Sequence, residues 1–385
     1  SPVKALIFDR TKTDWEASRG FELADVPQPE LDESSHPGDA DAVLIRVDYA
    51  GVCGSDRGIW YRQSFGDQIR TSLEAEGGAY RIIGHECFGH VVAIGSSVAR
   101  GGRLAVGDFV SCESHVICGS CYQCTRGQKN VCVNEKILGI STQGCFAEVL
   151  KVPAHIAWKT DTSKIRPEVA AVQEPFGNAV HAATRVPLAG KTIAVFGLGP
   201  IGLFTVLVAR ALGAEHIIGV DPNPISREMA LRLGIDYCIG VEGASDGIHH
   251  SAAVVKDVLA ATDGRGADVS FEMAGFNSSV NNAIHSTRRG GDVILFGIKS
   301  GDFTIENYDR LIVRGLTLHA VIGRQVFETW EQTRALLEQV DNKIQENIFN
   351  VILKGGIGTI LPIDEFTPQI FEKNMREQVK FLIQF

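Results

Sequence analysis

The sequence predicts an α/β protein in which a β-rich domain is joined to a second domain built on a parallel, doubly wound sheet. Short β-type segments separated by Gly- and Asp-rich turns fill the chain up to about residue 159. Strand-like and helix-like segments then alternate from about residue 174, which is the order typical of a parallel sheet. With 385 residues, the chain exceeds what one hydrophobic core usually serves, so two domains are expected.

Four apolar segments at short spacing favour a barrel-like arrangement in the first domain; they are 42–48, 90–94, 108–112 and 146–152. Residues 58–80 are polar and aromatic, and we expect a loop or a small helical insertion there.

The second domain is predicted to contain six strands with helices between them. The strands are 192–196, 216–220, 237–239, 267–271, 293–296 and 316–321, with helices at 201–212 and 225–233. A further helix is predicted over 327–340. The last ~60 residues are too few for a separate domain, so we expect them to pack back onto the first one.

Composition excludes several classes of function. Apolar residues make up 44% of the chain, but no run approaches the ~20 residues of a membrane span. The net charge is −9 without a Lys/Arg cluster, which argues against nucleic acid as a partner. Nine cysteines, an odd number, favour reduced thiols and a cytoplasmic protein. A small molecule is the expected partner.

Four cysteines form a C-x2-C-x2-C-x7-C pattern within residues 112–135. Four thiolates this close in sequence can surround one tetrahedral Zn²⁺ and leave no position for substrate. Two disulfides or buried thiols are the alternatives, and we disfavour disulfides because no signal-peptide pattern starts the sequence. The pattern predicts a structural zinc at Cys118, Cys121, Cys124 and Cys132.

Residues 197–202 read G-L-G-P-I-G between a predicted strand and a predicted helix. Gly197 allows the turn, Gly199 lets backbone N–H groups approach a pyrophosphate, and Gly202 permits close helix–strand packing. A proline suits the first helical turn, where its missing N–H costs nothing. The predicted cofactor-binding residues here are Gly197, Gly199, Pro200, Ile201 and Gly202.

Asp221 ends the second strand of this domain, where its carboxylate can accept hydrogen bonds from the adenosine ribose. A 2′-phosphate would meet the same carboxylate with like charge, so we expect NAD, with NADP as the alternative. Arg227 lies in the following helix and could soften that repulsion. If no cofactor binds, residues 197–202 would form a turn that serves packing alone, and Asp221 would belong to an Asp-Pro turn.

A second set of metal-binding side chains lies in C-G-S-D at 53–56 and G-H-E at 84–86. Cys53 offers a thiolate, His85 an imidazole and Glu86 a carboxylate, and three protein ligands plus water are the open pattern of a catalytic zinc. Asp56 is a natural acceptor for the His85 N–H and would fix its tautomer. Each residue alone is more often a packing or surface residue.

Together these motifs resemble the zinc-dependent medium-chain dehydrogenases of the alcohol dehydrogenase superfamily over nearly the whole chain. The closest similarity is to L-threonine 3-dehydrogenases, through residues 144–148, 174–181 and 323–330. The resemblance implies a GroES-like catalytic domain (1–175 and 323–385) and a Rossmann NAD-binding domain (176–322). It also implies a homo-oligomer, a tetramer ahead of a dimer.

By the same resemblance, Cys53, His85 and Glu86 belong to the catalytic zinc. Glu174 matches a carboxylate that ligates zinc or acts just beyond it, and Ser55 matches the hydroxyl that starts a proton relay. Four further cofactor-binding residues are implied: Phe296, Gly297, Ile298 and Val321.

One departure bears on the substrate. Threonine dehydrogenases carry a relay histidine two residues after the aspartate, whereas this chain has Gly58 there. Sugar and polyol dehydrogenases of the superfamily tolerate its absence. The predicted activity is hydride transfer from a secondary alcohol of a small polar substrate to NAD, of threonine or polyol/sugar type. A non-catalytic, zinc-stabilised dinucleotide-binding protein is the alternative.

Four other ionisable residues have simpler interpretations. His181 is expected to be packed, and His249 and His250 to be solvated in a polar loop. Arg324 could meet a substrate carboxylate or form a salt bridge between domains.

Overall fold

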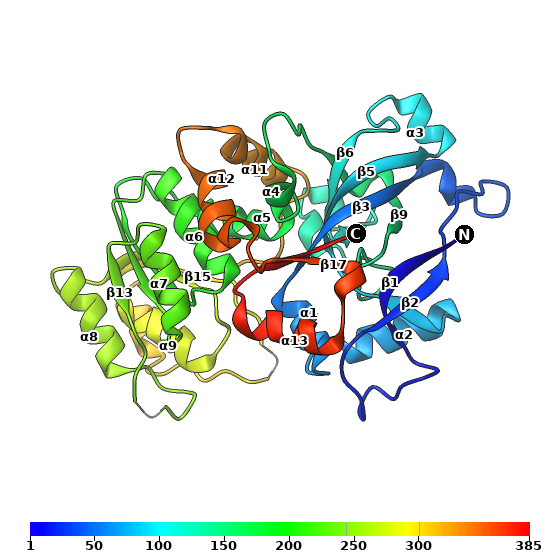
Figure 1. Ribbon diagram of the computed structural model, residues 1–385. Coiled ribbons are helices and arrows are strands. Elements are labelled where there is room, and N and C mark those ends of the chain that lie inside the picture. The colour runs from blue at the N-terminus through cyan, green and yellow to red at the C-terminus, as the bar shows by residue number, and fades with distance from the viewer. Residues whose placement is uncertain (244, 300) are drawn as a thin grey trace. The chain divides into compact units, whose positions relative to one another are not determined.

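The computed structural model describes residues 1–243, 245–299 and 301–385. The chain divides into two units (Figure 1). Unit 1 contains Ser1–Glu174 and Ile348–Phe385, and unit 2 contains Pro175–Asn347. No helix among the described residues is long and apolar enough to cross a membrane.

Unit 1 is β-rich, as predicted. Its larger sheet has the strand order β10-β6-β5-β3-β18-β17, and β9 also pairs with β3. These strands are β3 (Ala42–Val52), β5 (Glu86–Ile94), β6 (Phe109–Cys112), β9 (Val149–Pro153), β10 (Ala157–Lys159), β17 (Ile360–Pro362) and β18 (Phe381–Gln384). A smaller sheet joins β1 (Pro2–Asp9), β2 (Glu22–Pro27) and β4 (Tyr80–Ile82).

The last residues of the chain complete the larger sheet. β18 runs antiparallel to β3, with Phe381 opposite Val52. Figure 1 shows the red C-terminal strand beside the blue β3. The C-terminal segment therefore packs onto the first part of the chain, as expected from its length.

Residues 58–80 are mostly helical, in line with the predicted small insertion. They hold the end of α1 (Gly54–Trp60) and all of α2 (Gly66–Glu76). Trp60 is fully buried and stacks on Phe371 of α13 (Pro368–Glu377), with ring centroids 4.8 Å apart. This aromatic contact fixes α1, which starts directly after Cys53.

Unit 2 is built on a six-stranded sheet in the order β13-β12-β11-β14-β15-β16, with every pair parallel. The strands are β11 (Thr192–Phe196), β12 (His216–Val220), β13 (Tyr237–Ile239), β14 (Ala267–Glu272), β15 (Thr287–Leu295) and β16 (Thr317–Ala320). β11 is buried along its whole length, because a central parallel strand is covered on both faces. The predicted doubly wound sheet is confirmed.

Four of the described helices pack on this sheet (Figure 1): α6 (Pro200–Ala211), α7 (Pro224–Arg232), α8 (Ala252–Ala261) and α9 (Asn277–Ser286). α6 contacts β11, while α8 and α9 lie against each other and α9 packs on β14 and β15. The other helices in this part of the chain are α5 (Gln173–Ala183), α10 (Asp309–Val313), α11 (Glu328–Glu338) and α12 (Ile344–Asn347).

The predicted second boundary of this domain lies at residue 322, whereas unit 2 continues to Asn347. Two contacts explain the extension. The Arg324 guanidinium donates to Asn178 Oδ1 at 2.5 Å, and His181 Nδ1 lies 3.0 Å from the Gly323 carbonyl oxygen. Side chains of α5 therefore hold the segment that leads into α11.

Candidate active site

Strand pairing brings the two halves of the predicted catalytic zinc site together. β3 and β5 are antiparallel with Gly51 opposite Glu86, so the end of β3 meets the start of β5. Cys53 follows β3 and His85 precedes β5, and Cys53 Sγ lies 3.2 Å from His85 Nε2. Glu174 Oε2 and Glu86 Oε2 lie 3.5 Å and 3.8 Å from the same nitrogen. Cys53, Glu86 and Glu174 therefore all lie close to the His85 imidazole.

Asp56 caps the helix that follows Cys53. Its Oδ2 accepts the Cys53 backbone N–H at 2.9 Å, while Cys53 Sγ accepts the backbone N–H of Ser55 at 3.3 Å. The other oxygen, Oδ1, is 3.7 Å from His85 Nδ1, which is longer than a hydrogen bond. Burial raises the pKa of Asp56 to about 6.

The residues present fit a metal ion. Asp56 Oδ1 and Glu86 Oε2 are buried and have no hydrogen-bond partner among the described residues. Burial alone would lower the pKa of His85, but Cys53 and the nearby carboxylates raise it well above its usual value. The acidic groups around His85 therefore favour a positive charge beside them, which a bound metal ion would supply. The distances of 3.2–3.8 Å bracket the roughly 3.3 Å between ligand atoms around tetrahedral zinc.

Lys380 also lies at this site, although no motif in the sequence predicted its position there. Its Nζ donates to Glu86 Oε1 at 2.5 Å and to the Val52 carbonyl at 3.0 Å, and the side chain is buried. Burial lowers the pKa of a lysine, but the Glu86 carboxylate and the Cys53 thiol outweigh it and raise this pKa. Glu86 therefore has one oxygen bound to an ammonium group and one facing His85.

The position of the missing relay histidine is closed by packing. Gly58 is buried, and a Cβ there would lie 2.8 Å from Ser64 Oγ. Ser55, one turn earlier, is only half-buried. A larger side chain at position 58 would require Ser64 to move, and Gly58 itself offers no second relay group.

The four lobe cysteines also converge, with ligand atoms within 4.8 Å of one another. Cys121 Sγ and Cys132 Sγ are 3.9 Å apart, close to the ~3.8 Å expected for two sulfurs around zinc. Hydrogen bonds from the backbone and side chain of Ser120 and from Asn134 lower the pKa of Cys118 to about 5. Thiolates held by N–H groups are the form that binds metal.

The glycine-rich turn of unit 2 has the geometry that its sequence predicted. Gly197 has φ +100°, a conformation that favours glycine. A Cβ on Gly202 would lie 1.9 Å from the Gly197 carbonyl oxygen, so only glycine fits at this helix–strand contact. Gly199 precedes α6 and has open space around its Cα, and Pro200 starts the helix with Ile201 after it.

Asp221 closes this turn with both carboxylate oxygens. Its Oδ2 accepts the Leu198 N–H and its Oδ1 the Asn223 N–H, each at 2.7 Å. Arg227 donates to the carbonyls of Asp221 and Pro222 at 2.9 Å. The guanidinium is thus bound to backbone, whereas the sequence had suggested that it could reach a phosphate.

The remaining predicted cofactor-binding residues follow β15 and β16 at the same carboxyl edge of the sheet. The N–H groups of Phe296 and Gly297 donate to the Glu272 carbonyl at 3.0 Å, and Val321 N–H donates to the Leu295 carbonyl. Ile298 is 78% exposed. The Glu272 carboxylate accepts the Ala274 and Gly275 N–H groups and so holds the neighbouring loop. No motif in the sequence predicted this role.

Comparison with known proteins assigns the family. Residues 39–162 match the alcohol dehydrogenase GroES-like domain, and residues 200–339 match the zinc-binding dehydrogenase family. L-threonine 3-dehydrogenase of Pyrococcus horikoshii is 37% identical over 319 residues, which are 83% of this chain and 84% of that protein. This chain belongs to the zinc-dependent medium-chain dehydrogenases of the alcohol dehydrogenase superfamily. The dehydrogenase is a zinc-type, NAD-dependent oxidoreductase that acts on a small-molecule alcohol.

Solved structures share its fold. Alcohol dehydrogenase TADH from Thermus sp. ATN1 is 26% identical, with a TM-score of 0.79 over 99% of each chain. The alcohol dehydrogenase rspB from E. coli CFT073, solved with NADH, is 22% identical, with a TM-score of 0.77 over the full length of both chains.

Two expectations about histidines have different outcomes in this dehydrogenase. His181 is buried and hydrogen-bonded, as expected for a packed residue. The expectation of a solvated His250 is wrong. It contacts Glu306 and stacks on His285, because the loop that carries it folds against α9.

Replacing Asp56 by asparagine should preserve the helix cap but weaken the metal site of the dehydrogenase. The amide oxygen can still accept the Cys53 N–H, while the negative charge beside His85 is lost. We expect a roughly 10–100-fold loss of zinc affinity or turnover, measured at limiting zinc with circular dichroism as the control for folding. Unchanged turnover would show that Asp56 does not act on His85.

Proposed function

We propose that this dehydrogenase oxidises the secondary alcohol of a small polar substrate, with zinc at Cys53 and His85 and with NAD as the oxidant. The grouping of Cys53, His85 and Glu86, with Glu174 3.5 Å from His85 Nε2, carries this proposal. One buried Glu86 oxygen has no hydrogen-bond partner among the described residues. The open ligand set leaves a position for a substrate oxygen. A non-catalytic binding protein would not need such a position.

The two carboxylates have different roles in this proposal. Glu174 would supply the third zinc ligand, since its Oε2 lies nearer His85 Nε2 than that of Glu86 does. Glu86 would stay bound to Lys380 and serve as the alternative carboxylate ligand. The Lys380 ammonium keeps two buried carboxylates from repelling each other in a site of low polarity.

The chain's own residues position the substrate and move its proton. When bound, the metal supplies Lewis acidity that lowers the substrate hydroxyl pKa, and the dinucleotide supplies the hydride acceptor. Ser55 would accept the hydroxyl proton as it releases its own to water, because Gly58 has no side chain to carry it. Asp56 orients His85 through its negative charge.

L-Threonine, or another β-hydroxy amino acid, is the first candidate substrate. The relatives that match most of this chain are L-threonine 3-dehydrogenases at 33–37% identity. A polyol or sugar is the second candidate. This chain has Gly58 at the position of the relay histidine, and a Cβ added there would lie 2.8 Å from Ser64 Oγ. The absence of that histidine favours substrates of the polyol or sugar type.

A substrate screen separates these candidates. The purified protein is assayed with threonine, sorbitol, glucose and simple secondary alcohols at a fixed NAD concentration. Threonine should give the highest kcat/KM if the first candidate holds, and sorbitol or glucose if the second holds. Absence of NADH formation with every alcohol, in a protein that retains its zinc, would contradict the enzymatic proposal.

We propose a purely structural zinc in the lobe, at Cys118, Cys121, Cys124 and Cys132. Four cysteine ligands close the coordination sphere, so this ion has no open position for chemistry. Its contribution is to fold the lobe, as metal binding and folding are coupled in such small segments.

Cofactor choice should depend on Asp221. We expect NAD to be strongly preferred over NADP, because a 2′-phosphate would meet this carboxylate directly. Asp221→Ser should narrow or reverse the ratio of kcat/KM values, while Asp257→Ser on exposed α8 serves as the matched control. Comparable kcat/KM for both cofactors in the unmodified protein would contradict this assignment and point to Arg227 instead.

We also propose a homo-oligomer, a tetramer ahead of a dimer. β16 is the last strand of its sheet among the described residues, so one strand edge is open to pairing. Light scattering at micromolar concentration should give a multiple of the chain mass, and a monomer would refute the proposal.

A further inference from the structure

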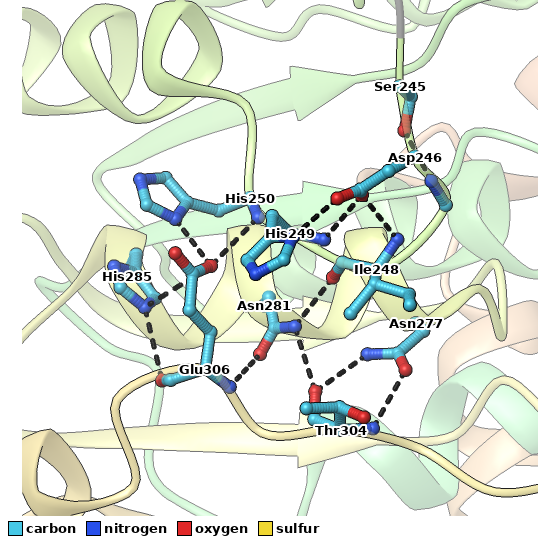
Figure 2. Close-up of polar contacts among 11 residues, drawn as sticks. Ser245, Asp246, Ile248, His249, His250, Asn277, Asn281, His285, Thr304 and Glu306 are labelled. Atoms are coloured by element: carbon cyan, nitrogen blue, oxygen red, sulfur yellow. Dashed lines mark hydrogen bonds and ion pairs between the residues drawn. The ribbon is translucent and has the colours of Figure 1, made fainter.

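Three metal-binding side chains meet in unit 2, apart from both cysteine sites. His250 immediately precedes the N-cap of α8, His285 lies near the end of α9, and Glu306 lies in the loop before α10. Figure 2 shows the two imidazoles and the carboxylate pointing toward one another. One ligand atom from each residue lies within 4.8 Å of the others.

The contacts of Glu306 define the centre of this cluster. Its Oε2 lies 2.7 Å from His250 Nδ1 and 4.0 Å from His285 Nε2. The same oxygen accepts the His250 backbone N–H at 3.0 Å. The imidazoles stack with centroids 4.1 Å apart, so both rings lie beside one carboxylate.

Two asparagines of α9 hold the three segments in place. Asn281 Nδ2 donates to the carbonyls of Ile248 and Thr304, and its Oδ1 accepts the Glu306 N–H at 3.1 Å (Figure 2). Asn282 Oδ1 accepts the Ser251 N–H at 2.7 Å. The backbone around the cluster is therefore fixed from α9, and the ligand positions are set before any ion binds.

We propose that His250, His285 and Glu306 form a third metal site, which takes a divalent transition metal such as Zn²⁺. Two imidazoles and a carboxylate are a donor set that zinc accepts, with water in the remaining position. The spacings of 2.7 Å and 4.0 Å bracket the roughly 3.3 Å expected around tetrahedral zinc. One of the two stacked rings must turn for both in-plane nitrogen lone pairs to reach one ion.

The site is accessible from solvent on one side. A cavity of about 420 Å³ adjoins His250 and is lined also by Asp246, His249, Ser251 and Asn282. The His250 side chain is 24% exposed, whereas that of His285 is 5% exposed. An ion can enter past His250 and bind against the buried ring.

A plain His250–Glu306 ion pair is the competing explanation. It accounts for the 2.7 Å contact, but it gives no role to the buried His285, whose Nε2 has only a 3.4 Å contact with the Glu306 carbonyl. A metal ion would replace the shared proton and engage all three side chains. It would then join the loop before α8, α9 and the loop before α10.

Cobalt spectroscopy tests this proposal, because the site contains no sulfur. The metal-free protein first receives two equivalents of zinc per chain, which the thiolate-containing sites bind ahead of an imidazole–carboxylate set, and Co²⁺ is then titrated into the intact protein. We expect about one further ion per chain, with weak visible bands and no thiolate-to-cobalt charge-transfer band. Calorimetry gives the affinity, and alcohol oxidation is not the readout, so the result is independent of the proposed function.

Variants identify the ligands. His285→Asn and Glu306→Gln should each weaken Co²⁺ binding at least about tenfold. His249→Gln is the matched control, because this neighbouring histidine pairs with Asp246 outside the cluster; its affinity should not change. No additional Co²⁺, a thiolate band accompanying it, or equal affinity in all variants would each overturn the proposal.

Discussion

Replacement of Cys53 by serine is expected to abolish alcohol oxidation and to remove one zinc per chain, while the lobe zinc stays. A serine hydroxyl does not ionise near neutral pH and is a much poorer zinc ligand than a thiolate. The loss should exceed the roughly 10–100-fold caused by removing a group that only orients a ligand. Metal analysis and turnover of the purified variant measure both effects.

Cys238→Ser provides the matched control for this substitution. Cys238 lies in β13 and, among the described residues, belongs to none of the cysteine clusters. The control should keep both zinc content and activity. Full activity of Cys53→Ser would contradict the assignment of the catalytic zinc. Mild chelation should likewise stop turnover before the fold is lost, because the open site exchanges its ion more readily than the closed one.

Replacement of Lys380 by methionine should have the largest effect on stability. It would leave the Glu86 carboxylate buried without its ammonium partner, and breaking a buried pair in this way costs about 3–5 kcal/mol. Urea unfolding of the zinc-loaded protein measures the free energy. Activity should fall as well, because Glu86 would be displaced relative to His85.

A double variant distinguishes the charge from the shape of this side chain. Adding Glu86→Gln to Lys380→Met removes both charges and should recover much of the lost stability. Lys373→Met on the exposed face of α13 is the single-substitution control and should change little. If the double variant were no more stable than Lys380→Met, the packing of the lysine stem would explain the effect.

Motifs that are local in sequence could be predicted well. The glycine-rich turn is specified by residues within one strand–turn–helix unit, and Gly202 is required by a contact only five residues away. The lobe cysteines are similarly close in sequence. Cys53 and His85 could be grouped by the types of ligand they offer, but β3–β5 register, rather than their spacing in sequence, brings them together.

Features that depend on distant segments could not be predicted. Lys380 directly precedes the apolar strand β18, and its partner Glu86 is 294 residues away in the sequence. The boundary at 347 depends on α5 holding Arg324, and the His250 cluster depends on the asparagines of α9. None of these contacts leaves a periodic or motif-like pattern in the sequence.

Unit 1 consists of two stretches of chain separated by the whole of unit 2, and this order has a consequence for synthesis on the ribosome. β18 and Lys380 are synthesised after all of unit 2, yet β18 pairs with β3 and Lys380 binds Glu86. Unit 2 is complete in sequence by Asn347 and can fold earlier. The nascent protein can therefore fold unit 2 before the larger sheet of unit 1 gains β18, and Glu86 gains its ammonium partner only after residue 380 has been made.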